Sequence, residues 1–128
     1  MIERREPSSS DVLIEIDYCG VCHTDLHFVN NDWGITEYPV VPGHEIVGRI
    51  SEVGTDVSRF QVGDLAAIGC MVNSCGDCQS CLDGNEQYCL KGFTATYNSP
   101  IEDPGGLTFG GYSQRIVADQ SFVLKMPE

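Results

Sequence analysis

The sequence predicts a small, mainly β domain, either a barrel or a sandwich. The chain of 128 residues is long enough for one compact core and too short for two ordinary domains. Short apolar segments with alternating polarity are separated by turn residues, as expected for β-strands. Fourteen glycines lie mostly at the ends of these segments, where a curved antiparallel sheet needs turns and bulges.

The first expected strand is DVLIEIDY, residues 11–18. Its alternation predicts a half-buried strand that leads to Cys19 at its end. One face carries Val12, Ile14, Ile16 and Tyr18, and the other carries Asp11, Leu13, Glu15 and Asp17.

The rest of the chain continues the same pattern. Residues 22–30 (CHTDLHFVN) are expected to form a short helix, and the prolines and glycine of 38–43 (YPVVPG) favour extended or turn geometry after it. Residues 45–54 and 63–69 are β-rich, and residues 111–126 are expected to form one or two more strands.

Composition excludes several classes of function. A formal charge of −12 repels nucleic acid and anionic lipid, so neither is an expected partner. No apolar run approaches the ~20 residues of a membrane span. The chain begins without the apolar segment of a secretory signal, so we expect a reduced, cytoplasmic setting. In such a setting disulfides are rare, so the seven cysteines favour metal binding or reactive thiols over a disulfide framework.

Four cysteines form the strongest local motif, C-x2-C-x2-C-x7-C, at Cys75, Cys78, Cys81 and Cys89. Four thiolates can close a tetrahedron around Zn²⁺, so the motif predicts a structural zinc site. An iron–sulfur cluster is a weaker alternative, because the ferredoxin motif places its fourth cysteine after three residues and follows it with proline. Four unligated reactive thiols in one loop are the remaining alternative.

A second group of chemically active residues is dispersed. Cys22 offers a soft ligand and His44 an imidazole, with Glu45 next to it. Thr24, Asp25 and His27 follow Cys22 closely and add groups that can orient a ligand or move a proton. Together these are the parts of a catalytic zinc site that keeps an open position.

The sequence resembles the zinc-dependent alcohol dehydrogenases of the medium-chain dehydrogenase/reductase superfamily. The segment GHEIVGRISEVGTDV, which begins at Gly43, fits the signature G-H-E-x2-G-x5-G-x2-V. CGVCHTD precedes it, and FQVGD and the four-cysteine motif follow it. The stretches GCMVNSCGDCQSC, ATYNSP and GGYSQRIV resemble the cinnamyl alcohol dehydrogenase branch, whose members reduce aldehydes with NADPH.

This resemblance implies that residues 1–128 are a GroES-like catalytic domain, a partly open β-barrel with short helices and a zinc lobe at about 70–92. Cys22, His44 and Glu45 would serve the catalytic zinc, with Asp25 orienting His44. The other implied roles are proton transfer by Thr24 and His27, contact with the cofactor pyrophosphate by His23, a substrate-pocket wall at Trp33, and structural zinc at Cys75, Cys78, Cys81 and Cys89.

Of the C-x2-C at residues 19–22, only Cys22 is expected to bind metal. Cys19 and Cys70 are expected to be packed thiols, because free cysteine is often buried. A redox dithiol at Cys19 and Cys22 is the minor alternative, since such pairs accompany a thioredoxin-like βαβ pattern that this sequence lacks.

Two parts of the family pattern are missing. No two of the fourteen glycines are spaced two apart, so the G-x-G-x-x-G motif of a Rossmann cofactor domain is absent. The family's third catalytic-zinc cysteine is also missing, because Cys89, the last cysteine, belongs to the lobe. We therefore expect a fragment of a longer enzyme.

The resemblance implies that this enzyme is a homodimer that transfers hydride between NADP(H) and a primary alcohol or aldehyde. The alternative hypothesis is a non-catalytic GroES-like zinc-binding module.

Overall fold

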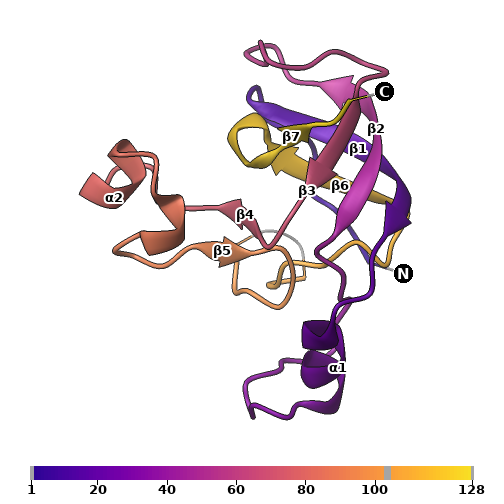
Figure 1. The fold of residues 1–128 in the computed structure, drawn as a ribbon, viewed down its shortest axis with the longest axis vertical. Helices are drawn as coiled ribbons and strands as arrows, with labels where there is room; N and C mark the ends of the chain where they lie inside the picture. The colour runs from indigo at the N-terminus through magenta and orange to yellow at the C-terminus, as the bar shows by residue number, and fades with distance from the viewer. Residues whose placement is uncertain (1, 103–104, 128) are drawn as a thin grey trace.

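The computed structural model describes residues 2–102 and 105–127, which form a mainly β structure (Figure 1). The strands are β1 (Asp11–Cys19), β2 (Ile46–Val53), β3 (Leu65–Ile68), β4 (Met71–Asn73), β5 (Thr94–Ala95), β6 (Arg115–Asp119) and β7 (Leu124–Lys125). The helices are α1 (His23–Asn30) and α2 (Gln79–Leu82), with 3-10 turns η1 (Glu86–Tyr88) and η2 (Gln120–Phe122). The predicted strands at 11–18, 45–54 and 63–69 and the helix at 22–30 are thereby confirmed, and 111–126 forms two strands.

Five strands form one antiparallel sheet in the order β6-β1-β2-β3-β7. Only the short turn η2 separates the two edge strands β6 and β7 along the chain. The sheet does not close through pairing of these strands within the described residues, which agrees with the predicted partly open barrel.

The core lies on one face of this sheet. Its residues come from β1, β2, β3 and β6 and from two positions outside the strands: Val12, Ile14, Ile46, Ile50, Phe60, Ala66, Ile68, Ile116, Ala118 and Val123. Burial of this apolar set provides the main stabilisation of the sheet.

The expected faces of β1 hold only as far as Ile16. Ile16 pairs with Gly48 and Tyr18 pairs with Val47, so Asp17 is an extra residue opposite none. This β-bulge reverses the alternation. Tyr18 is consequently 77% exposed, whereas Cys19 packs against the core, as predicted for that thiol.

The start of β1 also departs from the simple alternation. Asp11 was expected on the face opposite Val12, but it is only 2% exposed. Its carboxylate is hydrogen-bonded to the Arg5 guanidinium and to the Ser8 amide, which satisfies the buried charge.

A separate lobe projects from the sheet and contains α2 and η1 (Figure 1). The two short antiparallel strands β4 and β5 form its base. Cys70 lies just before β4 and is exposed, so its predicted packing is wrong. The Cys70 carbonyl accepts a hydrogen bond from the Thr96 amide at 3.0 Å. The backbone at this position is therefore held in place while the side chain remains in solvent.

None of the helices described in residues 2–102 and 105–127 is long and apolar enough to cross a membrane.

Candidate functional site

The pairing of β1 with β2 brings the dispersed site residues together. Cys19, the last residue of β1, lies opposite Ile46, the first residue of β2. The chain after β1 therefore meets the chain before β2, and the Gly20 amide donates to the Glu45 carbonyl at 2.9 Å. As a result, one ligand atom each of Cys22, His44 and Glu45 can lie within 4.8 Å of the others.

These three side chains offer a thiol, an imidazole and a carboxylate. Cys22 and His44 are half-buried and Glu45 is exposed, so the group opens to solvent on one side. Three protein ligands of these types with one open side fit a catalytic Zn²⁺ better than a closed structural site. The structure thus brings together the three residues predicted for the catalytic metal.

Helix α1 starts at this point because of Asp25. The Asp25 carboxylate accepts a hydrogen bond from the amide of Cys22, the N-cap residue, at 2.9 Å. This is the reaching-back half of a capping box, and a carboxylate in the first turn also complements the helix dipole. The spacing Cys22-x-x-Asp25 is the local signal for this start.

Asp25 is buried, with 2% of its surface exposed, yet its carboxylate is fully hydrogen-bonded. Besides the Cys22 amide it accepts from the Gly43 amide at 3.1 Å and from the Tyr112 hydroxyl at 2.7 Å. Burial alone would raise the pKa of Asp25, but these donors hold it below its ordinary value. The carboxylate is therefore ionised at neutral pH.

The hydrogen bond expected from Asp25 to the His44 imidazole is not among those of the described residues. Asp25 instead binds the amide of Cys22 and that of Gly43, the residue before His44. Asp25 is therefore linked to the predicted ligands Cys22 and His44 through the backbone of their segments.

Two tyrosines beside Asp25 were missed by sequence reasoning. Tyr112 donates to Asp25, and the ring of Tyr97 lies 5.5 Å from the His44 ring. The Tyr97 hydroxyl is buried and has no hydrogen-bond partner in the described part of the chain. Burial and the nearby Asp25 carboxylate raise the pKa of Tyr97. Both tyrosines lie in ATYNSP and GGYSQRIV, stretches noticed only for their family resemblance.

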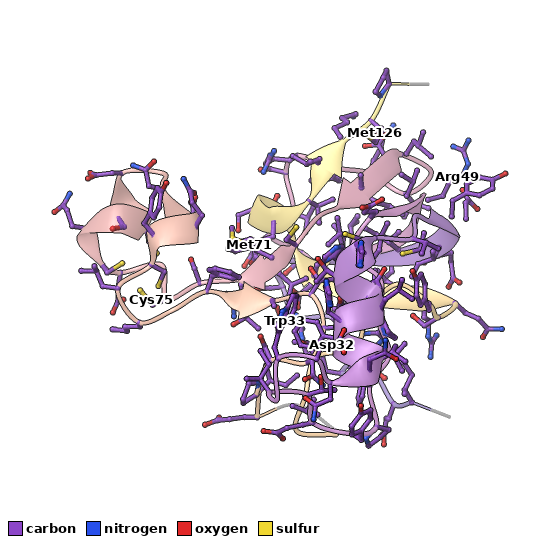
Figure 2. All side chains as sticks on the ribbon, turned by 60° about the horizontal axis from the view of Figure 1, so that its bottom comes forward. Asp32, Trp33, Arg49, Met71, Cys75 and Met126 are labelled. Atoms are coloured by element: carbon purple, nitrogen blue, oxygen red, sulfur yellow. The ribbon has the colours of Figure 1, made fainter. Side chains whose placement is uncertain are left out.

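The remaining predicted residues form an aromatic cluster along α1. The His23 and His27 rings stack with centroids 4.7 Å apart, and Trp33 lies 4.8 Å from His27. His27 Nδ1 is 2.7 Å from an oxygen of Asp32. Figure 2 shows Asp32 and Trp33 close to α1 and far from Cys75 in the lobe. Trp33 is 51% exposed, so it borders the site rather than filling a core.

Thr24 is half-buried in the first turn of α1. Its hydroxyl makes no hydrogen bond within residues 2–102 and 105–127, and no direct bond links it to His27. A proton passing from Thr24 to His27 would need a bridging group.

The four lobe cysteines have their sulfur atoms within 4.8 Å of one another. The Cys78 and Cys81 sulfurs are 3.5 Å apart, and those of Cys75 and Cys81 are 3.8 Å apart. A tetrahedral site with Zn–S bonds of about 2.3 Å requires sulfur separations of roughly 3.8 Å. The donor set and its spacing therefore fit a structural zinc ion.

Backbone amides lower the pKa of two of these thiols, which favours the thiolate form that binds a cation. The Leu90 amide donates to the Cys78 sulfur at 3.4 Å, and it is the main cause that lowers the pKa of Cys78 to about 6. The Cys75 amide likewise lowers the pKa of Cys89. A side-chain hydrogen bond with Asp77 raises the pKa of Cys75 to about 12, so this thiol would have to lose its proton when metal binds.

One cavity within the described residues lies away from both groups of predicted ligands. It has a volume of about 390 Å³ and is lined by residues of the N-terminal segment, β6 and the base of the lobe, among them Arg4, Asp11, Thr96 and Phe109. None of the residues predicted for the catalytic site lines this cavity.

Residues 8–128 match the family model described as the alcohol dehydrogenase GroES-like domain. The chain belongs to this family. The predicted resemblance and the GroES-like fold class are therefore confirmed.

Two relatives match nearly the whole chain. "Aldehyde reductase YahK" of Escherichia coli (strain K12) is 55% identical over 125 residues, which are 98% of this chain and 36% of that protein. "Probable cinnamyl alcohol dehydrogenase 6" of Oryza sativa subsp. japonica is 52% identical over 128 residues, which are 100% of this chain and 35% of that protein. The chain thus spans about a third of the length of these relatives.

Solved structures of family members agree in fold. A cinnamyl alcohol dehydrogenase from Sorghum bicolor superposes with a TM-score of 0.94 at 43% identity, covering 99% of this chain and 36% of that one. A cinnamyl alcohol dehydrogenase from Helicobacter pylori, complexed with NADP(H), gives a TM-score of 0.86 at 41% identity and covers 95% of this chain and 35% of that one.

Proposed function

We propose that residues 1–128 form the catalytic domain of a zinc-dependent oxidoreductase that transfers hydride between NADP(H) and a primary alcohol or aldehyde. The observation that supports this most directly is the meeting of Cys22, His44 and Glu45 at the open end of β1 and β2. The aldehyde reductase and cinnamyl alcohol dehydrogenases among the relatives support the substrate class.

Cys22 and His44 would hold the catalytic zinc, and Glu45 would complete or replace a ligand. When bound there, zinc supplies Lewis-acid polarisation of the substrate oxygen. Glu45 has the freedom for this role because it is exposed and because Gly20 lies against it. A Cβ atom at position 20 would lie 2.3 Å from a Glu45 carboxylate oxygen, so a side chain there would displace the carboxylate.

Thr24 and His27 would move the proton. The Asp32 carboxylate engages Nδ1 of His27, which leaves Nε2 to exchange a proton with solvent. The gap between Thr24 and His27 would be bridged by a bound group such as the cofactor ribose.

The aromatic side chains beside the site would line the substrate pocket. Trp33 packs edge-on against Phe28 with centroids 5.4 Å apart, and Phe28 packs in the same way against Tyr97 at 5.0 Å. Since Tyr97 in turn lies against His44, this series forms an apolar wall from solvent to the metal ligands. Such a wall favours an aldehyde with an apolar or aromatic body.

We also propose the remaining features of the whole enzyme. The NADP(H) complex of the Helicobacter pylori relative supports NADP as the cofactor, with His23 near its pyrophosphate and a Rossmann domain outside these residues. Residues 70–92 would be the structural-zinc lobe. A homodimer agrees with the family resemblance. A cytoplasmic location agrees with seven cysteines in the free state.

The test is NADPH-dependent reduction of an aromatic aldehyde by the full-length protein, followed by the loss of cofactor absorbance. Cys22→Ser should abolish turnover, whereas Cys70→Ser, a matched change at an exposed cysteine outside both ligand groups, should retain it. A non-catalytic zinc module would show no turnover in the parent protein. Equal rates for the parent and Cys22→Ser would refute the proposed metal ligand.

A further inference from the structure

The hydroxyl of Tyr112 donates a hydrogen bond to the buried carboxylate of Asp25. It lies 2.7 Å from one carboxylate oxygen of Asp25 and 3.3 Å from the Gly20 carbonyl. Tyr112 is 40% exposed, but this hydrogen bond is partly buried. Asp25 carries no ion pair in this part of the chain, so its buried charge depends on neutral donors.

Asp25 links the two segments that carry the metal ligands. One carboxylate oxygen receives the Cys22 amide as well as the Tyr112 hydroxyl, and the other oxygen receives the Gly43 amide. Cys22 is itself a ligand, and Gly43 directly precedes His44. The direction of this carboxylate therefore sets the distance between the two ligand segments.

The backbone around Tyr112 is fixed to the His44 segment. The Gly110 amide donates to the Val41 carbonyl at 2.7 Å, the Gly111 amide to Gly43 at 2.8 Å, and the Tyr112 amide to Pro42 at 3.0 Å. Tyr112 is thus held at a defined position, 87 residues from Asp25 along the chain.

The segment that contains Gly43 and the segment that contains Gly111 and Tyr112 are closely packed against Cys19. Gly43 has φ of +103°. A Cβ atom on it would lie 2.7 Å from the Cys19 sulfur and 3.0 Å from the Tyr112 ring. A Cβ atom on Gly111 would also lie 2.7 Å from the Cys19 sulfur. The Cys19 thiol, two glycines and the Tyr112 ring therefore form one close-packed unit beneath the ligands.

We propose that Tyr112 is a positioning residue for the Cys22, His44 and Glu45 centre and that it acts by fixing the direction of the Asp25 carboxylate. This inference rests on the proposed function, because it takes these three residues as metal ligands. Without the hydroxyl, one oxygen of a buried carboxylate loses a side-chain donor, and the carboxylate turns to recover hydrogen bonds. The two ligand segments then lose their fixed spacing.

The test compares metal affinities in the full-length protein and its Tyr112→Phe variant, which keeps the aromatic ring. Metal-free protein is titrated with Co²⁺ against a competing chelator, and the visible d–d absorption is followed. The wild-type protein should show one class of tight metal-binding sites, in the four-cysteine lobe, and one class of weaker sites, at the Cys22, His44 and Glu45 centre. Tyr112→Phe should weaken the second class about 10-fold, in the range found for outer partners of metal ligands, and alter its d–d spectrum.

The lobe serves as an internal control for folding. Within the described residues the Tyr112 hydroxyl bonds to Asp25 and Gly20 and to no residue of the lobe, so the metal affinity of the lobe should not change. Tyr18→Phe is the matched control variant, since it removes the same oxygen from a 77% exposed tyrosine on the adjoining strand. Equal affinity of the weaker class in wild type and Tyr112→Phe would overturn the role of Tyr112 alone. A wild-type protein with only the lobe class would overturn the metal centre itself, and the role of Tyr112 with it.

Discussion

Replacing Asp11 with asparagine should destabilise the chain at neutral pH without touching either ligand group. Asp11 is 2% exposed at the start of β1 and binds the Arg5 guanidinium through both oxygens and the Ser8 amide at 2.7 Å. Burial alone would raise the pKa of Asp11, but hydrogen bonds from Arg5 and Ser8 lower it from 3.8 to about 2. Asparagine keeps the shape of the side chain and removes the charge, so it resembles the protonated acid.

The expected loss follows from this pKa. One pH unit between the folded and unfolded pKa corresponds to roughly 1.4 kcal/mol, so a fall from 3.8 to about 2 gives about 2 kcal/mol. Because the folded pKa is the lower one, this stabilisation is complete above the unfolded pKa. It disappears as the pH falls from about 4 to about 2.

The assay is urea unfolding of parent and Asp11→Asn at a series of pH values, followed by circular dichroism. The free energies of unfolding should differ by about 2 kcal/mol at pH 7, and the difference should shrink below about pH 4. Asp17→Asn is the control, because Asp17 is an exposed residue of the same strand. A difference that is absent at neutral pH, or constant across the whole range, would refute the reasoning.

Three further changes test other parts of the structure. Cys81→Ser removes the buried predicted ligand of the lobe, so zinc content should fall by about one equivalent and the lobe should become sensitive to protease. Cys70→Ser should leave both properties unchanged, and zinc retained in Cys81→Ser would contradict the structural site. His27→Gln in the full-length protein should slow alcohol oxidation about 10-fold and respond to added imidazole, and an unchanged rate would remove His27 from proton transfer. Gly48→Ala should lower the free energy of unfolding in urea by about 1–3 kcal/mol, because its Cβ would lie 2.1 Å from the Glu15 carbonyl oxygen. Gly69→Ala, with open space around it, should show no such loss, and equal stabilities of the two variants would contradict the close packing of β1 on β2.

The sequence was sufficient to predict the long strands because their polarity alternates over many residues. It failed where a local irregularity changed the pattern. The bulge at Asp17 turned Tyr18 outward, and alternation alone carries no sign of it. Strands β4 and β5, with three and two residues, are too short to show any period.

Some parts of the candidate site could be predicted from local sequence patterns and others could not. The spacing of the four lobe cysteines is local, so the sequence alone indicated their grouping. Cys22 and His44 come together only through the pairing of β1 with β2, and the family signature was needed to connect them. Tyr112 lies 87 residues beyond Asp25 in the sequence and is brought to it by backbone pairing, so no local pattern predicts this contact.

The most direct test of the account is an anomalous difference map at the zinc edge from crystals of the full-length protein grown with zinc. Two peaks are expected. One should lie among Cys75, Cys78, Cys81 and Cys89, and the other between Cys22, His44 and Glu45 at the end of β1 and β2. A peak in the lobe with no density between Cys22 and His44 would contradict the assignment of these residues to a catalytic metal.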